Sequence, residues 1–229
     1  MLHSTTYLSC LSGVCRLREL AEELAQPNLH GLLCRFLFEQ LYPDLPIPED
    51  IEDEGMPWIS QRLKVGIHIN ASAIFYAPTE LSGPGGMHRE IIRATSTWYN
   101  KFPRYDTVLV TVNPELFGMM CFRVARVRQF ISFTHNDVLY PCALVEWFTT
   151  DAEGPDYATC MWVVRPEEVA GQRVSSVIAL SSIARACHLM PVLGRTFLPV
   201  DFHFSETLDA FRAYYVNCYI DGHAHETIL

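Results

Sequence analysis

The sequence lacks the excess of positive charge that broad nucleic-acid binding requires. Its 229 residues carry 17 Lys and Arg against 26 Asp and Glu, which gives a formal net charge of −9. A protein that binds nucleic acid over its whole surface needs a basic footprint, so this class is disfavoured, whereas a local basic patch is compatible with the composition. Hydrophobic residues make up 49% of the chain, an ordinary share for a globular protein with a buried core.

Patterns typical of secretion, membrane insertion and cysteine scaffolds are also missing. None of the eight cysteines forms a C-x-x-C pair, and most lie in apolar segments, where a reduced Cys behaves as a small hydrophobe. No apolar run reaches the length of a membrane span, and residues 1–14 lack the basic region of a signal peptide. We therefore expect a reducing location, nuclear or cytoplasmic, and no membrane partner.

Residues 105–148 indicate the core of the fold. Three runs rich in Val, Ile, Phe and Leu are separated by Asn113-Pro114 and by the turn residues 134–137. β-branched and aromatic residues favour strands, and Asn, Asp and Pro favour turns. The pattern predicts that residues 119–133 and 138–148 pair as an antiparallel hairpin.

Both faces of this hairpin are apolar. Val127, Ile131 and Phe133 are expected on one face of the first strand, and Phe122, Val124 and Phe130 on the other. A strand of this kind is covered on both sides, so other elements must pack over it.

The N-terminal third predicts a helical hairpin followed by a linker. Residues 16–25 and 28–41 place leucines at helical spacing on either side of Pro27. Such a pair is either a partner-binding unit or a covering layer for the sheet, and its generic apolar stripe favours the second. Residues 43–58 contain four prolines and six acidic residues, which is typical of a solvated connector, with an acidic docking segment as the alternative. The expected domains are 1–42, 43–60 and 61–229.

The remaining segments complete an α+β prediction. Residues 65–75, 161–164 and 174–180 read as strands, residues 87–94 as a helix, and residues 205–222 as a C-terminal helix with Ser205 as its N-cap. Many short strands separated by turns favour a curved, mostly antiparallel sheet or a small barrel, closed by the C-terminal helix.

Two sets of basic residues are candidates for nucleic-acid contact. Arg123, Arg126 and Arg128 lie within one predicted strand beside phenylalanines, and His88, Arg89 and Arg93 follow a glycine-rich turn. Arginines beside aromatic rings can stack on bases and bind phosphates. The alternative for the strand arginines is pairing with a carboxylate on the neighbouring strand, such as Glu146. The turn itself lacks both the Gly-Lys-Ser/Thr ending of a phosphate loop and the spacing of a dinucleotide motif.

One possible metal site lies near the C-terminus. His223, His225 and Glu226 offer metal-binding groups, but a zinc site needs a further ligand or a bound water, and terminal histidines are usually only exposed. A metal-dependent hydrolase using these residues is therefore an alternative function. The main expectation is a protein without a cofactor and without catalytic residues.

Much of the chain resembles a known family. Segments such as FYAPTELSGPGGMHREIIRAT, RYDTVLV, VARVRQFISF, YPCALVEWF, MWVVRPE, RACHLMPVLG and LPVDFHFSETLDAFRAYYVNCYIDGHAHE are similar to the C-terminal region of proteins encoded by Plavaka-type DNA transposons of mushroom-forming fungi. The resemblance implies a transposase whose acidic, metal-binding catalytic triad lies upstream of this region. No acidic residue here matches a triad motif, so no catalytic residue is carried over.

The sequence also departs from the pattern of that family. Where relatives resemble VIHLDSI, residues 177–183 read VIALSSI, and Cys160 stands where a Gly usually precedes the Met. We therefore expect a non-catalytic accessory region that binds DNA, chromatin or another protein chain. The alternative to this and to the hydrolase is a transposon relic without a selected function.

Overall fold

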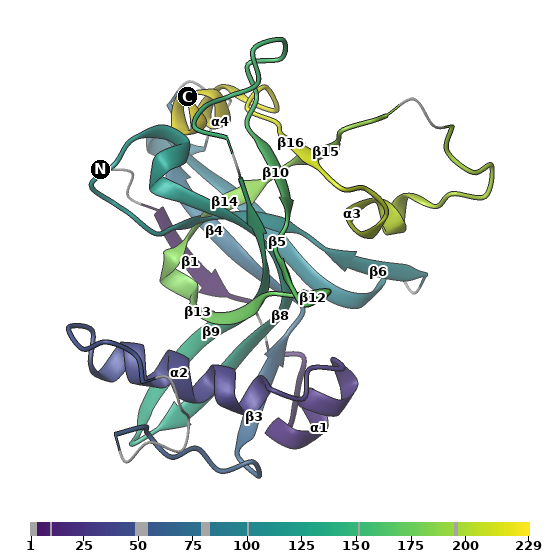
Figure 1. The fold of residues 1–229 in the computed structure, drawn as a ribbon. Coiled ribbons are helices and arrows are strands. Elements are labelled where there is room, and N and C mark those ends of the chain that lie inside the picture. The colour runs from purple at the N-terminus through teal and green to yellow at the C-terminus, as the bar shows by residue number, and fades with distance from the viewer. Residues whose placement is uncertain are drawn as a thin grey trace.

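The computed structural model describes residues 4–9, 11–48, 55–78, 83–99, 101–150, 152–194 and 197–229, and it has an α+β fold (Figure 1). Strands dominate and form a curled half-barrel, which confirms the predicted fold class. The strand pairs of the described residues are antiparallel.

The predicted central hairpin is present. Strands β8 (Phe122–His135) and β9 (Val138–Thr149) are the longest pair in the molecule and are joined by a two-residue turn. Both turn residues, Asn136 and Asp137, have positive φ angles, 49° and 61°. Two left-handed residues match the twist of the flanking strands, which is why Asn and Asp suit this position.

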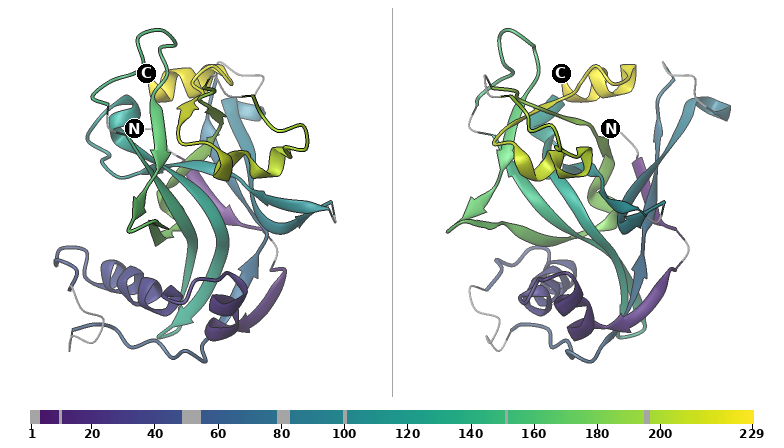
Figure 2. Two further views of the ribbon diagram at one scale, coloured as in Figure 1. Left: turned by 45° about the vertical axis from the view of Figure 1, so that its right-hand side comes forward. Right: turned by 90° about the vertical axis from the view of Figure 1, so that its right-hand side faces the viewer.

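Neighbouring strands extend the sheet from both edges of the hairpin. Beside β8 lie β7 (Thr107–Thr111), which pairs with β14 (Ile183–Cys187), and β3 (Lys64–His68), which pairs with β2 (Gly13–Arg16). Beside β9 lie β13 (Ser175–Ala179) and β10 (Val163–Pro166), and β10 leads on to β16 (Tyr214–Val216) and β15 (Leu189–Pro191). Each long strand therefore changes its outer partner along its length, and the sheet curls (Figure 2).

Strand β8 contains a bulge at Arg128. Val127 pairs with Val145, and Gln129 pairs with Leu144, so one residue on β8 has no partner on β9. A bulge of this kind bends the strand and redirects the side chains that follow it.

The bulge overturns both expected groupings of side chains on the faces of β8. Phe130 does not share a face with Phe122 and Val124, which belong to another core. Val127 does not share a face with Ile131 and Phe133. It packs in one core with Phe130, whereas Ile131 and Phe133 belong to a second core on the opposite side. Simple alternation fails here because the extra residue reverses the parity of the strand.

A second sheet covers one face of the hairpin. Its strands are β1 (Ser4–Leu8), β4 (Asn70–Tyr76), β5 (Met87–Trp98) and β6 (Phe102–Tyr105), in that order. Inward side chains of β4 and β5, including Ala73, Phe75 and Ile92, share one core with β7, β8 and β9.

Two of the strand and helix predictions for this region are wrong. The helix predicted at residues 87–94 is part of strand β5. The strand predicted at residues 65–75 is interrupted at Ile69, because β3 joins the large sheet and β4 joins the second one. In β5, the alternation of buried Ile92 and Ala94 with outward Ile91 and Arg93 fits the two-residue period of a strand.

The predicted helical hairpin is also present. Helices α1 (Leu17–Glu23) and α2 (Leu29–Leu41) pack over the other face of the sheet, on side chains of β8, β9 and β13 (Figure 1). They form a covering layer for the sheet, which is the interpretation that their generic apolar stripe favoured. Ile59, from the segment predicted as a linker, is 3% exposed in the same core. Residues 49–54 of that segment lie outside the described part of the chain.

The long C-terminal helix predicted at residues 205–222 is wrong. The segment instead forms a turn of 3₁₀ helix η4 (Phe204–Glu206), the short helix α3 (Thr207–Ala210), strand β16 and helix α4 (Gly222–Ile228). Tyr214 and Val216 are fully buried in a third core, where β16 completes the ladder between β10 and β15. Sheet pairing and burial outweigh the helical spacing of the sequence.

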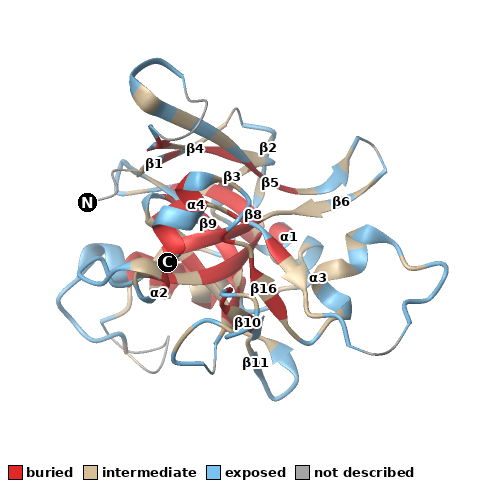
Figure 3. Cartoon of the chain, turned by 90° about the horizontal axis from the view of Figure 1, so that it is seen from above, coloured by how far each residue is buried: buried red, intermediate tan, exposed pale blue. Residues whose placement is uncertain are grey.

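Small elements fill the connections: β11 (Glu168–Val169), β12 (Gln172–Arg173), η1 (Pro84–Gly86), η2 (Gly118–Cys121) and η3 (Leu180–Ser182). Seen from above, the buried residues concentrate in the central strands, and the peripheral segments carry the exposed ones (Figure 3). Among the described residues, no helix is both long and apolar enough to cross a membrane.

Candidate functional site

A groove opens where the β5–β6 end of the second sheet meets the η4–α3 turn, and both lie on one side of the molecule (Figure 1). Its volume is about 520 Å³. Its lining comes from the β5–β6 hairpin, from the bulged strand β8 and from the C-terminal segment. The lining residues are Trp98, Tyr99, Phe102, Pro103, Arg104, Tyr105, Arg126, Phe204, Ser205 and Leu208. We name it the Trp98–Phe204 groove.

Aromatic rings form much of the wall. Tyr99 is 76% exposed and Phe204 is 62% exposed, so both offer ring surface to a ligand. The rings of Phe102 and Phe204 meet edge to face, with centroids 4.7 Å apart, and this contact holds the C-terminal segment against β6. Exposed rings at a groove are suited to stacking against flat, unsaturated ligands.

Arginines lie over two of the aromatic rings. The guanidinium carbons of Arg93 and Arg104 are 4.5 and 5.1 Å from the ring centroid of Trp98. Those of Arg126 and Arg128 are 5.4 and 4.6 Å from the ring centroid of Tyr105. Stacking holds each guanidinium in a fixed orientation while its N–H groups stay available at the edge.

Arg126 is the buried member of this set. It is only 4% exposed, and its Nη1 donates a hydrogen bond to Oδ1 of Asp209 in α3 over 2.6 Å. Its Nε is buried and has no hydrogen-bond partner among the described residues. A buried N–H without an acceptor costs about 1–3 kcal/mol.

Carboxylates balance most of the positive charge. Arg104 pairs with Asp106 at 2.8 Å, and Arg126 pairs with Asp209. Within the described residues, Arg93 forms no ion pair, and its Nη1 donates to the carbonyl of Ile91 over 3.2 Å. The groove therefore combines stacking surface with a small excess of positive charge.

Arg128 pairs with Glu146 at 3.5 Å. Glu146 lies on the neighbouring strand β9. It is the carboxylate predicted from the sequence as the alternative partner for the arginines of β8.

The structure separates the six predicted nucleic-acid contacts into several places. Arg126 lines the groove, whereas Arg93 and Arg128 stack on two of its rings, Trp98 and Tyr105. The other three lie elsewhere: Arg123 pairs with Glu167 and lies over Trp147, Arg89 faces outward from the second sheet over Tyr7, and His88 faces inward beside Phe75. Because residues 87–94 form a strand, successive side chains point to opposite faces.

The predicted metal-binding residues do not converge. Nδ1 of the buried His223 accepts a hydrogen bond from Nη1 of Arg185 over 2.8 Å. His225 is exposed and lies against the ring of Tyr219, with centroids 5.6 Å apart, and Glu226 is exposed. In the described part of the chain, no group of three or more His, Cys, Asp or Glu is placed to hold a metal ion.

A buried ionic cluster surrounds Arg185, and sequence reasoning did not anticipate it. Arg185 is 3% exposed and pairs with Glu90 of β5 at 2.6 Å and with Asp221, the N-cap of α4, at 2.5 Å. Burial raises the pKa of Glu90 against the opposing pull of Arg185. Burial acts the same way on Asp221, but hydrogen bonds from Arg185 and from the Ala224 N–H hold the pKa of Asp221 below its usual range.

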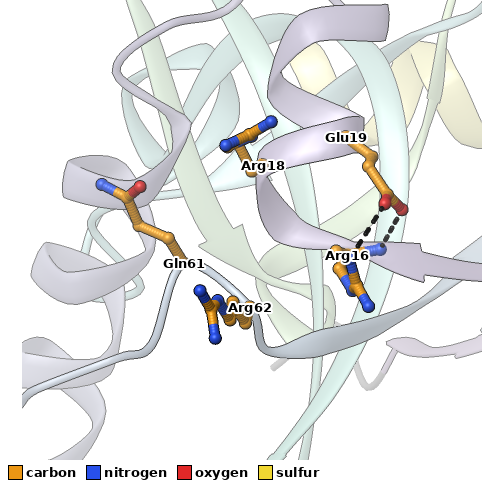
Figure 4. Close-up of a pocket in the computed structure, with 5 residues that line it drawn as sticks. All are labelled: Arg16, Arg18, Glu19, Gln61 and Arg62. Atoms are coloured by element: carbon orange, nitrogen blue, oxygen red, sulfur yellow. Dashed lines mark hydrogen bonds and ion pairs between the residues drawn. The ribbon is translucent and has the colours of Figure 1, made fainter.

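A second hollow, of about 550 Å³, lies at the start of α1 and is drawn in Figure 4. It is lined by Arg16, Arg18, Glu19, Gln61 and Arg62. Its ion pairs are exposed: the side chains of Arg16 and Glu19 are 62% and 55% exposed at a separation of 3.8 Å. The first amides of α1 already donate to carbonyls of Gln61 and Leu63. This hollow has neither free amides nor aromatic rings, so the Trp98–Phe204 groove is the better-built site.

One signal in the sequence could have indicated the groove. Residues 98–105 interleave aromatic and basic residues, a composition typical of surfaces that bind single-stranded nucleic acid. The contribution of Asp209 and Phe204 could not be read in this way, since Asp209 is 83 residues from Arg126 in the chain. Comparison with known proteins adds no further assignment: the chain matches no family model, no curated protein and no solved structure.

Proposed function

We propose that this chain is a non-catalytic interaction module that binds nucleic acid in the Trp98–Phe204 groove. The observation that carries the proposal is the combination of exposed aromatic rings with arginines stacked on the rings of the groove. Bases stack on aromatic side chains regardless of sequence, and arginine binds phosphate oxygens with well-defined geometry.

Each part of a nucleotide has a counterpart in the groove. The rings of Tyr99 and Phe204 are exposed enough to take a base. Arg93 supplies charge that no carboxylate of the described residues neutralises. A net charge of −9 opposes nonspecific binding over the whole surface, so contact is expected where positive charge is left without a carboxylate partner.

The resemblance to Plavaka-type transposon proteins fits a nucleic-acid partner, and an accessory role beside a transposase is part of the proposal. Sequencing the transcript and genomic DNA upstream of Met1 tests that role. A frame continuing in phase into a nuclease domain with an acidic triad supports it. A frame interrupted by stops favours a stranded relic.

Binding itself is tested with a fluorescein-labelled oligothymidylate and fluorescence anisotropy. Phe204→Ala removes an exposed ring, and Trp98→Ala removes the ring on which Arg93 and Arg104 stack; each should weaken binding about tenfold, within the roughly 1–3 kcal/mol that base stacking contributes. Arg126→Lys keeps a positive charge beside Asp209 but removes the planar guanidinium that stacks on Tyr105, and it should also weaken binding. Tyr157→Ala is the matched control, since Tyr157 is fully exposed and lies outside the groove lining.

The salt dependence provides a second readout. With one or two phosphate contacts, the logarithm of the association constant should fall with the logarithm of salt concentration with a slope of about −1, since each contact to a single strand contributes about −0.7. Absence of binding by the parent protein, or unchanged affinity in all three groove variants, would refute the proposal.

A further inference from the structure

The outer face of the second sheet carries large side chains that are partly exposed in the described part of the chain. The inner face of β4 and β5 packs against the central hairpin, whereas the alternate residues point outward. Four of the outward residues are between 40% and 54% exposed: Tyr7, Tyr76, Met87 and Ile91. An antiparallel sheet often leaves one face to solvent, but such a face is usually polar. Here large apolar and aromatic side chains share the face with Arg89, Arg93 and smaller polar residues such as Ser72.

Arg89 is held flat on this face. Its guanidinium carbon is 5.9 Å from the ring centroid of Tyr7. Its Nε and Nη2 donate to Oγ of Ser72 over 3.2 and 2.9 Å. Ser72 is 1% exposed although it lies on the outward side of β4, between Tyr7 and Ile91 in the strand register. Among the described residues, Arg89 forms no ion pair, so its charge is available to an anion.

Arg93 links the outer face to a ring that lines the groove. Arg89, Ile91 and Arg93 lie on the same side of β5, and Arg93 stacks on Trp98 at the groove. Residues four apart on a strand are separated by about 13 Å. The two arginines therefore mark a path from the groove to Tyr7.

We propose that a single-stranded nucleic acid bound in the Trp98–Phe204 groove continues across the outer face of the second sheet, with a base on Tyr7 and a phosphate on Arg89. This inference rests on the proposed function. It specifies the path of the bound nucleic acid over the surface and that this nucleic acid is single-stranded. Positive charge without a paired carboxylate fits a polyanion, and exposed rings fit unstacked bases. A duplex keeps its base faces hidden, so the rings favour a single strand.

The test uses two lengths of labelled oligothymidylate, about 4 and about 15 nucleotides, which span the site sizes of known single-strand binding surfaces. The short oligonucleotide should fill the groove alone, and the long one should bind more tightly. Tyr7→Ala and Arg89→Ser should each weaken binding of the long oligonucleotide, by about tenfold for the lost stacking partner. Neither should change binding of the short one. Arg18→Ala, which removes an exposed arginine of α1, is the control.

The other outcomes distinguish the inference from the function on which it rests. If Trp98→Ala weakens both lengths while the two sheet variants bind both like the parent, the path across the sheet is overturned and the groove stands. If neither length binds, both proposals fail. If a duplex or polyglutamate binds as tightly as the long single strand and responds equally to Arg89→Ser, the assignment to single strands is overturned.

Discussion

Arg185 donates two hydrogen bonds to the carboxylate of Asp221, over N···O distances of 2.9 and 2.5 Å. Asp221 in turn caps α4, because its Oδ1 accepts from the Ala224 N–H over 2.6 Å. Arg185 also donates to Glu90 of β5. One guanidinium of β14 thus joins the large sheet, the second sheet and the C-terminal helix.

Replacing Arg185 with Met should lower the free energy of unfolding by about 3 kcal/mol. The substitution leaves two partly buried carboxylates without a cation, and breaking a buried pair from one side is strongly destabilising. Urea denaturation followed by circular dichroism measures the change. Arg18→Met is the control: its pair with Glu22 is exposed on both sides and should contribute less than about 1 kcal/mol. Equal small effects of both substitutions would show that the cluster does not hold the fold.

Stability should fall when the pH drops below the usual pKa of histidine. Arginine can only donate, so Nδ1 of His223 accepts from Arg185 and the ring is neutral. Burial, and then the charge of Arg185, lower the pKa of His223, whereas Asp221 and Glu226 oppose this and His88 adds to it. Between the folded pKa and about 6.5, the unfolded state binds more protons, so acidification favours unfolding.

The contribution of Glu90 to stability has the opposite pH dependence, so the measurement must distinguish it from the contribution of His223. Its folded pKa is raised, so its contribution to stability is present at low pH and is lost as pH rises through that pKa. Unfolding free energies at about pH 7 and pH 5 should therefore be compared between the parent and His223→Asn. We expect a smaller loss on acidification in the variant. An identical loss would mean that His223 is not the group responsible.

The turn of the central hairpin should accept glycine and reject β-branched residues. Asp137 has φ 61° and is exposed, so its backbone conformation rather than any contact limits the choice of residue. Asp137→Gly should raise stability by up to about 1 kcal/mol, and Asp137→Val should lower it by about 1–2 kcal/mol. Thermal and urea denaturation measure both. Equal stabilities would indicate that the turn changes conformation to accommodate valine.

Thiol reactivity should follow burial. Burial raises the pKa of the fully buried Cys142, and it raises the pKa of Cys187 to about 12, whereas Cys160 is exposed. Because the thiolate is the reactive form, iodoacetamide should modify Cys160 in the native protein and Cys142 and Cys187 only after unfolding. Mass spectrometry of peptides resolves the sites. Native modification of Cys142 as fast as that of Cys160 would contradict the packing around β9.

Local patterns predicted the elements whose partners are near in sequence. The hairpin of β8 and β9 follows from two apolar runs around Asn136 and Asp137, and the pair of α1 and α2 follows from leucine spacing on either side of Pro27. Residues 87–94 and 205–222 were predicted wrongly because strand pairing outweighs their helical spacing, even where the partner strand is the next one in the chain, as β4 is for β5. Tyr214 and Val216, for example, are buried by β10 and β15.

The candidate site was predicted only in part for the same reason. Arg93, Arg126 and Arg128 were identified from their residue type and neighbours; Arg126 lines the groove, and the other two stack on its aromatic rings. Their aromatic platforms come from the β5–β6 hairpin, and Asp209 comes from the far C-terminal segment. No spacing rule in the sequence brings these elements together.

By itself, the sequence determined the α+β class, the central hairpin with its apolar faces and the covering helices, because alternation, helical period and turn chemistry act over a few residues. Only the tertiary structure decided which arginines are paired and which are available, and where the bulge at Arg128 reverses the strand faces. It also decided that His223 accepts a hydrogen bond from Arg185, whereas His225 and Glu226 lie at the surface. Those outcomes depend on contacts between residues far apart in the chain, and the free energy of such contacts is set by the burial and geometry of the completed fold.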